Sequence, residues 1–277
     1  MILKDYGNVA DLSRMLRDGS LTSVSLVLKC LQNIEKLNPE LNAFISVYNT
    51  TALEDAQRCD QERAGCIDKG LMHGIPVALK GNIDCANELT TSCSAAFQDN
   101  IAIGDARCVT RLREGGAIIL GKTNMHELAY GGTGEISIAG PACNPWDPER
   151  LAGGSSSGSA VAVASGMVPA ALGSDTGGSV RIPAAACGIV GFKPSIGSIS
   201  TSGVMPLSWT LDHVGPLART VEDVWILAGV LGELGSSLDK LRGEPLNPNQ
   251  GLASAPTRIG VARFPDLELD PTVGERF

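Results

Sequence analysis

Apolar residues recur along this chain at two spacings, and each spacing predicts a different kind of element. Between Ser23 and Leu37 they fall three or four residues apart, as on one face of a helix. Short apolar runs such as Ile75–Lys80 are typical of buried strands. The predicted helices are Val9–Arg17, Ser23–Leu37, Thr51–Arg63, Asp105–Glu114, Ser159–Ala164 and Val221–Leu234, and the predicted strands are Ile75–Lys80, Ala117–Leu120, Val168–Gly173 and Arg258–Ala262.

The order of these elements indicates the fold class. Because helices and strands alternate along the chain, the sequence predicts an α/β fold. We expect a mixed β-sheet with helices on both of its faces. Pro39 is expected to end the helix that begins at Ser23. Residues 235–256 are polar and are interpreted as a linker, roughly at these bounds. Lys80 is expected at the carboxyl end of its strand, where catalytic groups often lie in open α/β sheets.

Composition and charge narrow the classes of function. The 277 residues carry a formal net charge of −8, which gives no diffuse attraction to nucleic acid or to anionic membranes. No stretch approaches the roughly 20 apolar residues that a membrane span requires, and the N-terminus has no apolar signal core. The sequence therefore predicts a cytoplasmic protein that binds neither nucleic acid nor membrane.

The eight cysteines and three histidines do not form a metal-binding or redox pattern. The cysteines include no C-x-x-C pair, and His73, His126 and His213 lie far apart in sequence. A metal site would require these residues to converge in the fold. We therefore expect reduced thiols, no metal and no cofactor.

One segment, Gly116–Thr123, fits the phosphate-loop pattern GxxxxGK[ST] letter for letter. A phosphate cradle needs its middle residues in a loop with N–H groups turned inward, whereas the run Ala-Ile-Ile-Leu favours a buried strand. Nucleotide chemistry is therefore the weaker interpretation of this segment.

A second glycine-rich segment, Gly154–Gly158, matches the nucleophile elbow G-x-S-x-G and would make Ser156 the nucleophile of an α/β-hydrolase. That enzyme needs an acid and then a histidine downstream. Only His213 is available, next to Asp212, and adjacent residues rarely line up as a relay. This interpretation is also weak.

Three motifs in a fixed order carry a more specific signal. They are Lys80 after the run GIPVAL, the loop GGSSSGSA at 153–160 and the loop DTGGSVRIPA at 175–184. With these motifs the chain resembles the amidase signature family. The similarity extends through Gly121–Asn124, Asn144–Trp146, Cys187–Pro194 and Leu211–Pro216. The resemblance implies the amidase-signature fold, with residues 1–277 as the N-terminal portion of a longer family domain that is incomplete on its C-terminal side.

The resemblance also implies a catalytic triad. Ser179 would be the nucleophile, Ser155 a bridging residue that follows a cis peptide bond, and Lys80 the base. A serine hydroxyl needs a neighbouring base, and without a placed histidine a neutral lysine is available. Burial must then lower the lysine pKa from its reference value of about 10.4. The implied reaction is hydrolysis of a carboxamide C–N bond through an acyl-enzyme, with a small-molecule amide as substrate.

The backbone of the second loop is suited to stabilise a developing oxyanion. The N–H groups of Thr176, Gly177, Gly178 and Ser179 can turn toward one point, as an oxyanion hole requires. Ala129 matches a position that lines the acyl pocket in relatives, and Ser155 is the other candidate substrate contact.

Other features near these motifs favour a structural role. Asp175 and Arg181 flank the nucleophile, and a salt bridge between them that holds the loop is the simpler interpretation. Lys122 is interpreted as structural rather than as a second base. Glycine- and serine-rich loops are often flexible linkers, so the two loops indicate catalysis only in combination with Lys80.

Two positions depart from the family, and several alternatives stay open. Gly81 stands where relatives commonly carry an acidic residue, and Ser157 stands where they carry a glycine, so altered loop packing is expected. The alternatives are an inactive truncated amidase-like protein or binding module, and the glutaminase subunit of a tRNA amidotransferase, which shares the triad. A homodimer is allowed as the oligomeric state.

Overall fold

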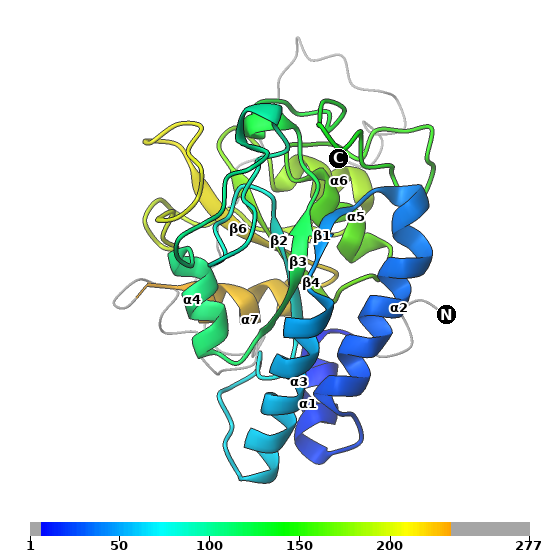
Figure 1. Ribbon diagram of the computed structural model, residues 1–277, viewed down its shortest axis with the longest axis vertical. Helices are drawn as coiled ribbons and strands as arrows, with labels where there is room; N and C mark the ends of the chain where they lie inside the picture. The colour runs from blue at the N-terminus through cyan, green and yellow to red at the C-terminus, as the bar shows by residue number, and fades with distance from the viewer. Residues whose placement is uncertain (1–6, 234–277) are drawn as a thin grey trace, which may run out of the picture. The chain divides into compact units, whose positions relative to one another are not determined.

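Three parallel strands form the centre of the fold, and each is buried along its whole length (Figure 1). They are β2 (Pro76–Lys80), β3 (Ile118–Thr123) and β4 (Ala170–Asp175). Each one corresponds to an apolar run that predicted a strand. The computed structural model describes residues 7–233, which lie in one compact unit. The predicted strand Arg258–Ala262 and the predicted linker at 235–256 lie outside the described residues.

Antiparallel strands complete the mixed sheet on both sides. β1 (Phe44–Val47) pairs with β3, β6 (His213–Ala218) pairs with β4, and β5 (Val190–Gly191) pairs with β6. The resulting order is β1-β3-β2-β4-β6-β5. The sequence pattern predicted none of these three strands, because β1 and β5 are too short for a periodic signal and the Gly-Pro pair within β6 disfavours a strand.

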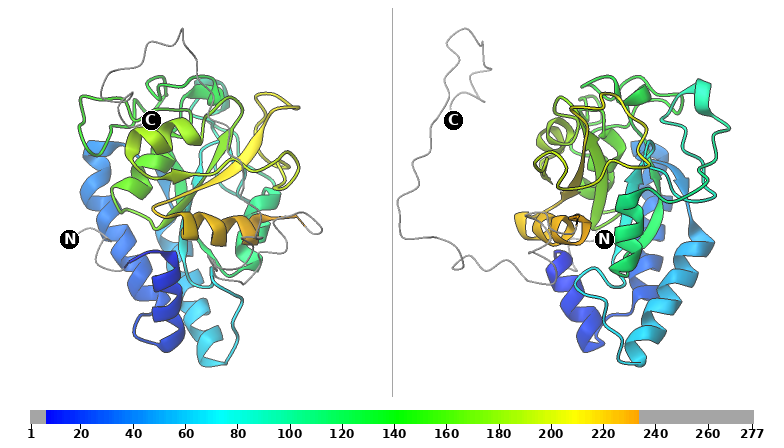
Figure 2. Two further views of the ribbon diagram at one scale, coloured as in Figure 1. Left: turned by 180° about the vertical axis from the view of Figure 1, so that it is seen from behind. Right: turned by 90° about the vertical axis from the view of Figure 1, so that its left-hand side faces the viewer.

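Seven α-helices in the described part of the chain flank this sheet: α1 (Val9–Asp18), α2 (Ser23–Leu41), α3 (Asn49–Ala64), α4 (Arg107–Glu114), α5 (Ser157–Ala164), α6 (Arg181–Cys187) and α7 (Val221–Leu231). The right-handed crossovers β2–α4–β3 and β3–α5–β4 run in opposite directions along the sheet, which places α4 and α5 on opposite faces (Figures 1 and 2). α7 packs against β6 and also contacts α4 and α1. The prediction of helices on both faces is confirmed.

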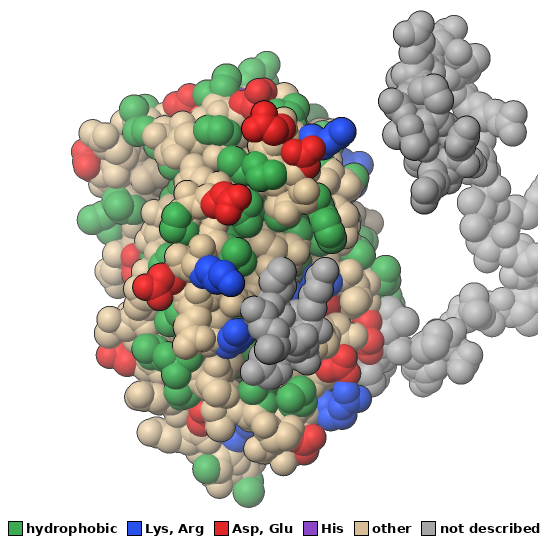
Figure 3. All heavy atoms as spheres, turned by 90° about the vertical axis from the view of Figure 1, so that its right-hand side faces the viewer, with side chains coloured by type: hydrophobic (Ala, Val, Ile, Leu, Met, Phe, Trp, Pro, Cys, Tyr) green, Lys and Arg blue, Asp and Glu red, His purple; other side chains and the backbone are tan. Residues whose placement is uncertain are grey.

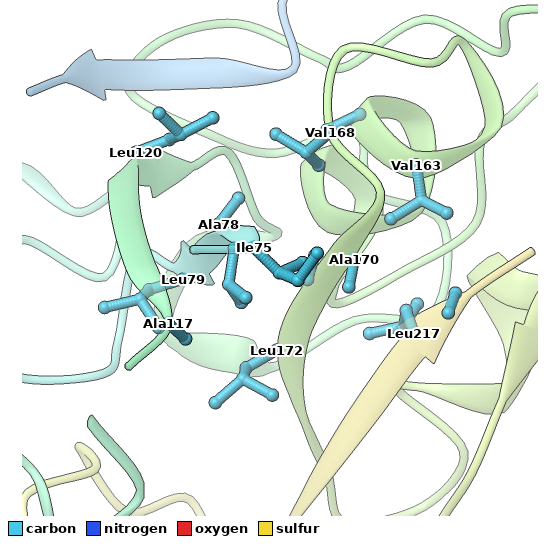
Figure 4. Packing of buried hydrophobic residues seen from close by; sticks show 14 of the residues in the cluster. Ile75, Ala78, Leu79, Ala117, Leu120, Val163, Val168, Ala170, Leu172 and Leu217 are labelled. Atoms are coloured by element: carbon cyan, nitrogen blue, oxygen red, sulfur yellow. The ribbon is translucent and has the colours of Figure 1, made fainter. Parts of the chain in front are cut away.

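The main core surrounds the central strands and includes buried residues of α2, α3, α4, α5 and α7, and Figure 4 shows the part around the strands and α5. Leu120 of β3, Leu172 of β4 and Val163 of α5 are all fully buried there. Every residue of α5 from Ser157 to Val163 is buried, which is why the helix consists of small residues on every side. The Ser159 hydroxyl donates to the Leu172 carbonyl at 2.9 Å, so burial of this polar group is compensated.

A smaller apolar cluster is separate from this core. It consists of Cys93, Met125 and Ala129, each no more than 5% exposed, with Ile45 packed against it. Cys93 belongs to the segment after β2, and Met125 and Ala129 belong to the segment after β3. The cluster therefore supports the loops at the carboxyl ends of the strands rather than the sheet itself.

Pro39 does not end α2, and the sequence prediction is wrong at this point, because the helix continues to Leu41. A proline in the last turn removes only one hydrogen bond of the helix. Asn38 compensates, since its side chain accepts the Phe44 N–H at 2.7 Å and donates to the Phe44 carbonyl at 3.0 Å. Asn42 then ends the helix in the left-handed conformation, with a φ of 49°.

The surface carries both signs of charge. On the face drawn in Figure 3, basic side chains are separated by acidic and apolar ones. Among the described helices, none is both long enough and apolar enough to cross a membrane.

Gly121 of β3 should not tolerate a side chain. Its φ is +151°, and a Cβ there would overlap the Ser46 carbonyl of the neighbouring strand β1. Gly121→Ala should lower the free energy of unfolding by about 2 kcal/mol or more, because both the backbone strain and the overlap must be relieved. Gly104→Ala is the matched control, since no atom lies within 4 Å of its Cβ position. Urea unfolding that gave the two variants equal stability would contradict this prediction.

Candidate active site

Lys80 is the last residue of β2, and none of its surface reaches solvent. Its Nζ lies 2.7 Å from Ser155 Oγ, 2.9 Å from Ser174 Oγ and 3.4 Å from the Ser174 carbonyl oxygen. The parallel pairing of β2 with β4 brings Lys80 beside Ser174, since both lie near the carboxyl ends of these strands. The predicted position of Lys80 at the end of a strand is confirmed.

Burial lowers the pKa of Lys80 to about 7, because the ammonium form loses its hydration. The negative charge of Asp175 opposes this effect and raises the pKa of Lys80, and Cys93 and Asp212 have smaller effects in the same direction. At neutral pH a large fraction of the side chain is therefore the neutral amine, which can accept a proton.

Ser155 lies in the loop of residues 153–156, called here the Ser155 loop, and is fully buried. The peptide bond between Gly154 and Ser155 is cis, as the family resemblance implied. Two backbone bonds hold this loop: the Gly154 N–H donates to the Gly132 carbonyl at 2.7 Å, and the His126 N–H donates to the Ser155 carbonyl at 3.0 Å. The segment after β3 thus fixes the loop that presents this hydroxyl to the lysine.

Ser179 lies between β4 and α6, in the loop of residues 176–180 called here the Ser179 loop, and is half-buried. Its carbonyl oxygen accepts the Ser156 N–H at 3.1 Å, which joins the two loops. Its hydroxyl makes no hydrogen bond to any residue within 7–233. The structure therefore brings Lys80 and Ser155 into contact and places Ser179 beside them, without the direct contact between the two serine hydroxyls that the resemblance implied.

The Asp175 carboxylate organises the Ser179 loop. It accepts the N–H groups of Gly178 at 2.8 Å and Val180 at 3.1 Å, and Arg181 donates to it through Nε at 3.0 Å and through a terminal nitrogen at 2.9 Å. Burial alone would raise the pKa of Asp175, but the bonds from Arg181 and the backbone hold this pKa below its usual range. The predicted salt bridge between Asp175 and Arg181 is confirmed.

These bonds occupy one of the four predicted oxyanion donors. The Gly178 N–H points at Asp175 Oδ1, which removes Gly178 from the donor set. The N–H groups of Thr176, Gly177 and Ser179 donate to no residue in the described part of the chain. Gly177 is exposed, with no atom within 4 Å of its Cβ position, so space is open in front of this loop.

A pocket opens beside Thr176, the first residue of the Ser179 loop. The described residues that line it are Asn82, Ala129, Ser174, Thr176, Thr201, Val204, Met205, Pro206, Leu207, Trp209, Asp212 and His213. Ala129 lies on a wall of this pocket, and its role as a contact for an acyl group stays a prediction. Much of the opposite wall is apolar and comes from the segment before β6.

Two polar residues of this site were missed by the sequence analysis. Ser174 bonds directly to the lysine amine, and Asn82 donates through Nδ2 to Ser174 Oγ at 3.1 Å. Both are nearly fully buried, with exposed fractions of 6% and 1%. The available signal was their place in the chain, since Asn82 follows Lys80 by two residues and Ser174 directly precedes Asp175.

The rejected motifs have structural roles. Most of the phosphate-loop match Gly116–Thr123 is the buried strand β3, as the apolar run indicated. Lys122 of this strand is fully buried and bonds to the Ile83 carbonyl and, at 3.1 Å, to Thr90 Oγ1. Ser156 is buried as well, and its hydroxyl donates to the Ser174 carbonyl at 3.2 Å.

The two departures from the family pattern lie in tightly packed places. A Cβ at Gly81 would lie 3.1 Å from both the Thr123 carbonyl and Ile45 Cδ1, so this position has little room for an acidic side chain. The Ser157 hydroxyl is buried and has no partner among the described residues. Both departures therefore affect packing at the edge of the site, and neither removes a group that contacts Lys80.

Three side chains distant in sequence from these loops could ligate a metal. Cys59, Glu62 and His73 bring one ligand atom each to within 4.8 Å of one another. They already bond to protein groups: His73 Nε2 lies 2.9 Å from Glu62 Oε2, and Lys69 Nζ lies 2.6 Å from Glu62 Oε1. The arrangement needs no ion to be satisfied, and the absence of a metal stays a prediction.

Comparison with known proteins places this site in a family. The family model described as Amidase matches residues 25–277. A Glutamyl-tRNA(Gln) amidotransferase subunit from Coxiella burnetii is 46% identical over 224 residues, which are 80% of this chain and 46% of that protein. The peptide amidase from Stenotrophomonas maltophilia has 38% identity and a TM-score of 0.79, over 84% of this chain and 49% of its own.

A second solved structure, of an amidase, matches with 41% identity and a TM-score of 0.77, over 81% of this chain and 51% of its own. This chain spans about half the length of the curated relatives it matches. The family match covers most of the residues and includes both loops and the lysine. The chain therefore belongs to the amidase family.

Proposed function

We propose that this chain hydrolyses the C–N bond of a carboxamide through an acyl-enzyme, with Ser179 as nucleophile, Ser155 as relay and Lys80 as base. The observation that carries the proposal is the 2.7 Å separation between Lys80 Nζ and Ser155 Oγ, at a lysine with no exposed surface. The carbonyl oxygen of Ser179 accepts the N–H of Ser156, which belongs to the Ser155 loop. Ser179 is only half-buried, so a substrate can reach it.

The contacts of Lys80 suit the neutral amine. A neutral amine has two N–H donors and one lone pair, and Ser174 offers a hydroxyl and a carbonyl oxygen as acceptors for the donors. The lone pair is then left to accept the Ser155 proton. Asn82 holds Ser174 from the other side. Ser174 and Asn82 are therefore proposed as residues that orient the base.

The proposed reaction has two halves. Ser179 Oγ attacks the carbonyl carbon while its proton passes to Ser155 and the Ser155 proton passes to Lys80 Nζ. Return of a proton along the same path to the nitrogen of the tetrahedral intermediate breaks the C–N bond and releases the amine, which leaves an ester on Ser179. Water, deprotonated through the same groups, then hydrolyses that ester to the acid and regenerates the serine.

The oxyanion formed in both halves needs fixed donors. The free N–H groups of Thr176, Gly177 and Ser179 are proposed for this role, and Asp175 with Arg181 keeps the loop in place. Loss of one such donor typically costs about 3 to 4 kcal/mol of transition-state stabilisation.

A second candidate function is hydrolysis of glutamine to supply ammonia. It is favoured by curated relatives that are named as a Glutamyl-tRNA(Gln) amidotransferase subunit, of which one is 46% identical to this chain. The wall formed by Met205, Leu207 and Trp209 instead favours an apolar acyl group. The remaining alternative is an inactive truncated amidase-like protein or binding module. Amide hydrolysis that depends on Ser179 would exclude it.

Ser179→Ala should reduce amide hydrolysis by roughly 10⁴-fold or more, since the change removes the nucleophile. The fold should persist, because only one hydroxyl without a bond to the described residues is lost. Ser195→Ala is the matched control, as this serine is exposed and does not line the pocket. Ammonia release by the Ser179 variant within tenfold of the parent would remove this residue from the mechanism.

The pH dependence of kcat/KM should report Lys80. Only the neutral amine accepts a proton, so kcat/KM should be low below pH 7 and should increase as the pH rises through about 7. Lys80→Met, which keeps the apolar volume, should lose nearly all activity, and Lys36→Met at an exposed position should keep the parental profile. A parental profile that is flat between pH 6 and 8, roughly one unit on each side of this pKa, would argue against a lysine base.

Substrate comparison separates the two candidate functions. We expect kcat/KM for benzamide to exceed that for glutamine, because Val204, Met205, Pro206, Leu207 and Trp209 form an apolar stretch of the pocket wall. Ammonia release from both amides by the same preparation measures this ratio. Preference for glutamine that disappears in Ser179→Ala would favour the second candidate instead.

A further inference from the structure

The Asp212 carboxylate joins two segments that are far apart in sequence. Its Oδ1 accepts the hydroxyl of Thr176 in the Ser179 loop. Its Oδ2 accepts the N–H groups of Leu207 at 2.8 Å and Ser208 at 2.9 Å. One side chain therefore receives three donors, two from the segment before β6 and one from the loop that carries Ser179.

The sheet explains why these groups meet. β4 and β6 pair antiparallel, and their last pair at this end is Asp175 with His213. Thr176 follows β4 and Asp212 precedes β6, so the same register places these two residues opposite each other just beyond the ladder. The turn before β6 is closed by Leu211 and Asp212, whose N–H groups donate to the Ser208 carbonyl at 3.0 and 2.9 Å.

We propose that Asp212 is a positioning residue, which ties the Ser179 loop to the pocket wall through the Thr176 hydroxyl and thereby keeps the free N–H groups of that loop aimed at the substrate carbonyl. This inference rests on the proposed amide hydrolysis. Asp175 holds the inner side of the loop through Gly178 and Val180. Asp212 holds the first residue of the loop, which Asp175 does not contact through a hydrogen bond.

The charge of Asp212 has a separate effect on the base. The charged groups that act on Lys80 come from three segments: Asp175 at the end of β4, Cys93 after β2 and Asp212 before β6. The charge of Lys80 in turn acts on His126, after β3. The charge of Asp212 favours the ammonium form of Lys80. Removal of this charge should therefore move the acid limb of the rate profile to lower pH.

Two variants separate the contact from the charge. Thr176→Val removes the hydroxyl and keeps the charge. Asp212→Asn removes the charge but keeps the contacts, because its carbonyl can accept the two backbone N–H groups while its amide donates to Thr176 Oγ1. Asp147→Asn is the control, since its ion pair with Arg150 is exposed.

The readout is the rate at which a fluorophosphonate labels Ser179, measured against pH and located by mass spectrometry. Thr176→Val should slow labelling by roughly tenfold or more with the acid limb unmoved, because the oxyanion donors lose their alignment. Asp212→Asn should shift the acid limb to lower pH, and Asp147→Asn should match the parent.

The inference is overturned if Thr176→Val is labelled at the parental rate, or if Asp212→Asn leaves the acid limb in place. If Thr176 and Asp212 had only a structural role, both variants would be labelled more slowly and the acid limb of the labelling rate would stay at the parental pH. A parent that is not labelled at Ser179 would overturn the proposed function as well, and this result is distinct from equal labelling of parent and variants.

Discussion

Burial of one amine at the end of β2 is the constraint on which the proposed active site depends. A lysine in water is protonated and cannot act as a base, so the fold must exclude water from Lys80 and still satisfy its N–H groups. The fully buried strands β2, β3 and β4 provide the first condition, and Ser174 and Ser155 provide the second. A change that admits water at this strand end would first raise the pKa of Lys80, before it lowered the stability of the fold.

The carboxylates of Asp175 and Asp212, which hold the Ser179 loop, also limit how far burial lowers the pKa of Lys80. Asp175 and Asp212 fix the Ser179 loop by accepting N–H and hydroxyl donors. Their negative charges favour the ammonium form of Lys80 and oppose the effect of burial. The pKa of about 7 is therefore a balance between desolvation and the charges needed to hold the loop.

The sequence predicted those parts of the site that local residues determine. Lys80 follows an apolar run, so the strand end could be expected, and the cis bond at Ser155 was implied by the family resemblance that the two loops carry. Pairing between distant segments was not visible. β6 contains Gly215 and Pro216, so its partnership with β4, and with it the contact of Asp212 to Thr176, depends on the neighbouring strand. The engagement of the Gly178 N–H by Asp175 was missed for a related reason, since a backbone donor carries no signal of its partner.

The cluster of Cys93, Met125 and Ala129 has a consequence for how this family can diversify. It supports a pocket wall but shares no buried residue with the main core. Substitutions within it would change the shape of the wall without altering a residue of the main core. Selectivity for different acyl groups would therefore be altered more readily here than along β2, whose Val77, Ala78 and Leu79 belong to that core. Because Cys93 also acts on Lys80 through its charge, the wall and the proposed base are packed separately but share one electrostatic link.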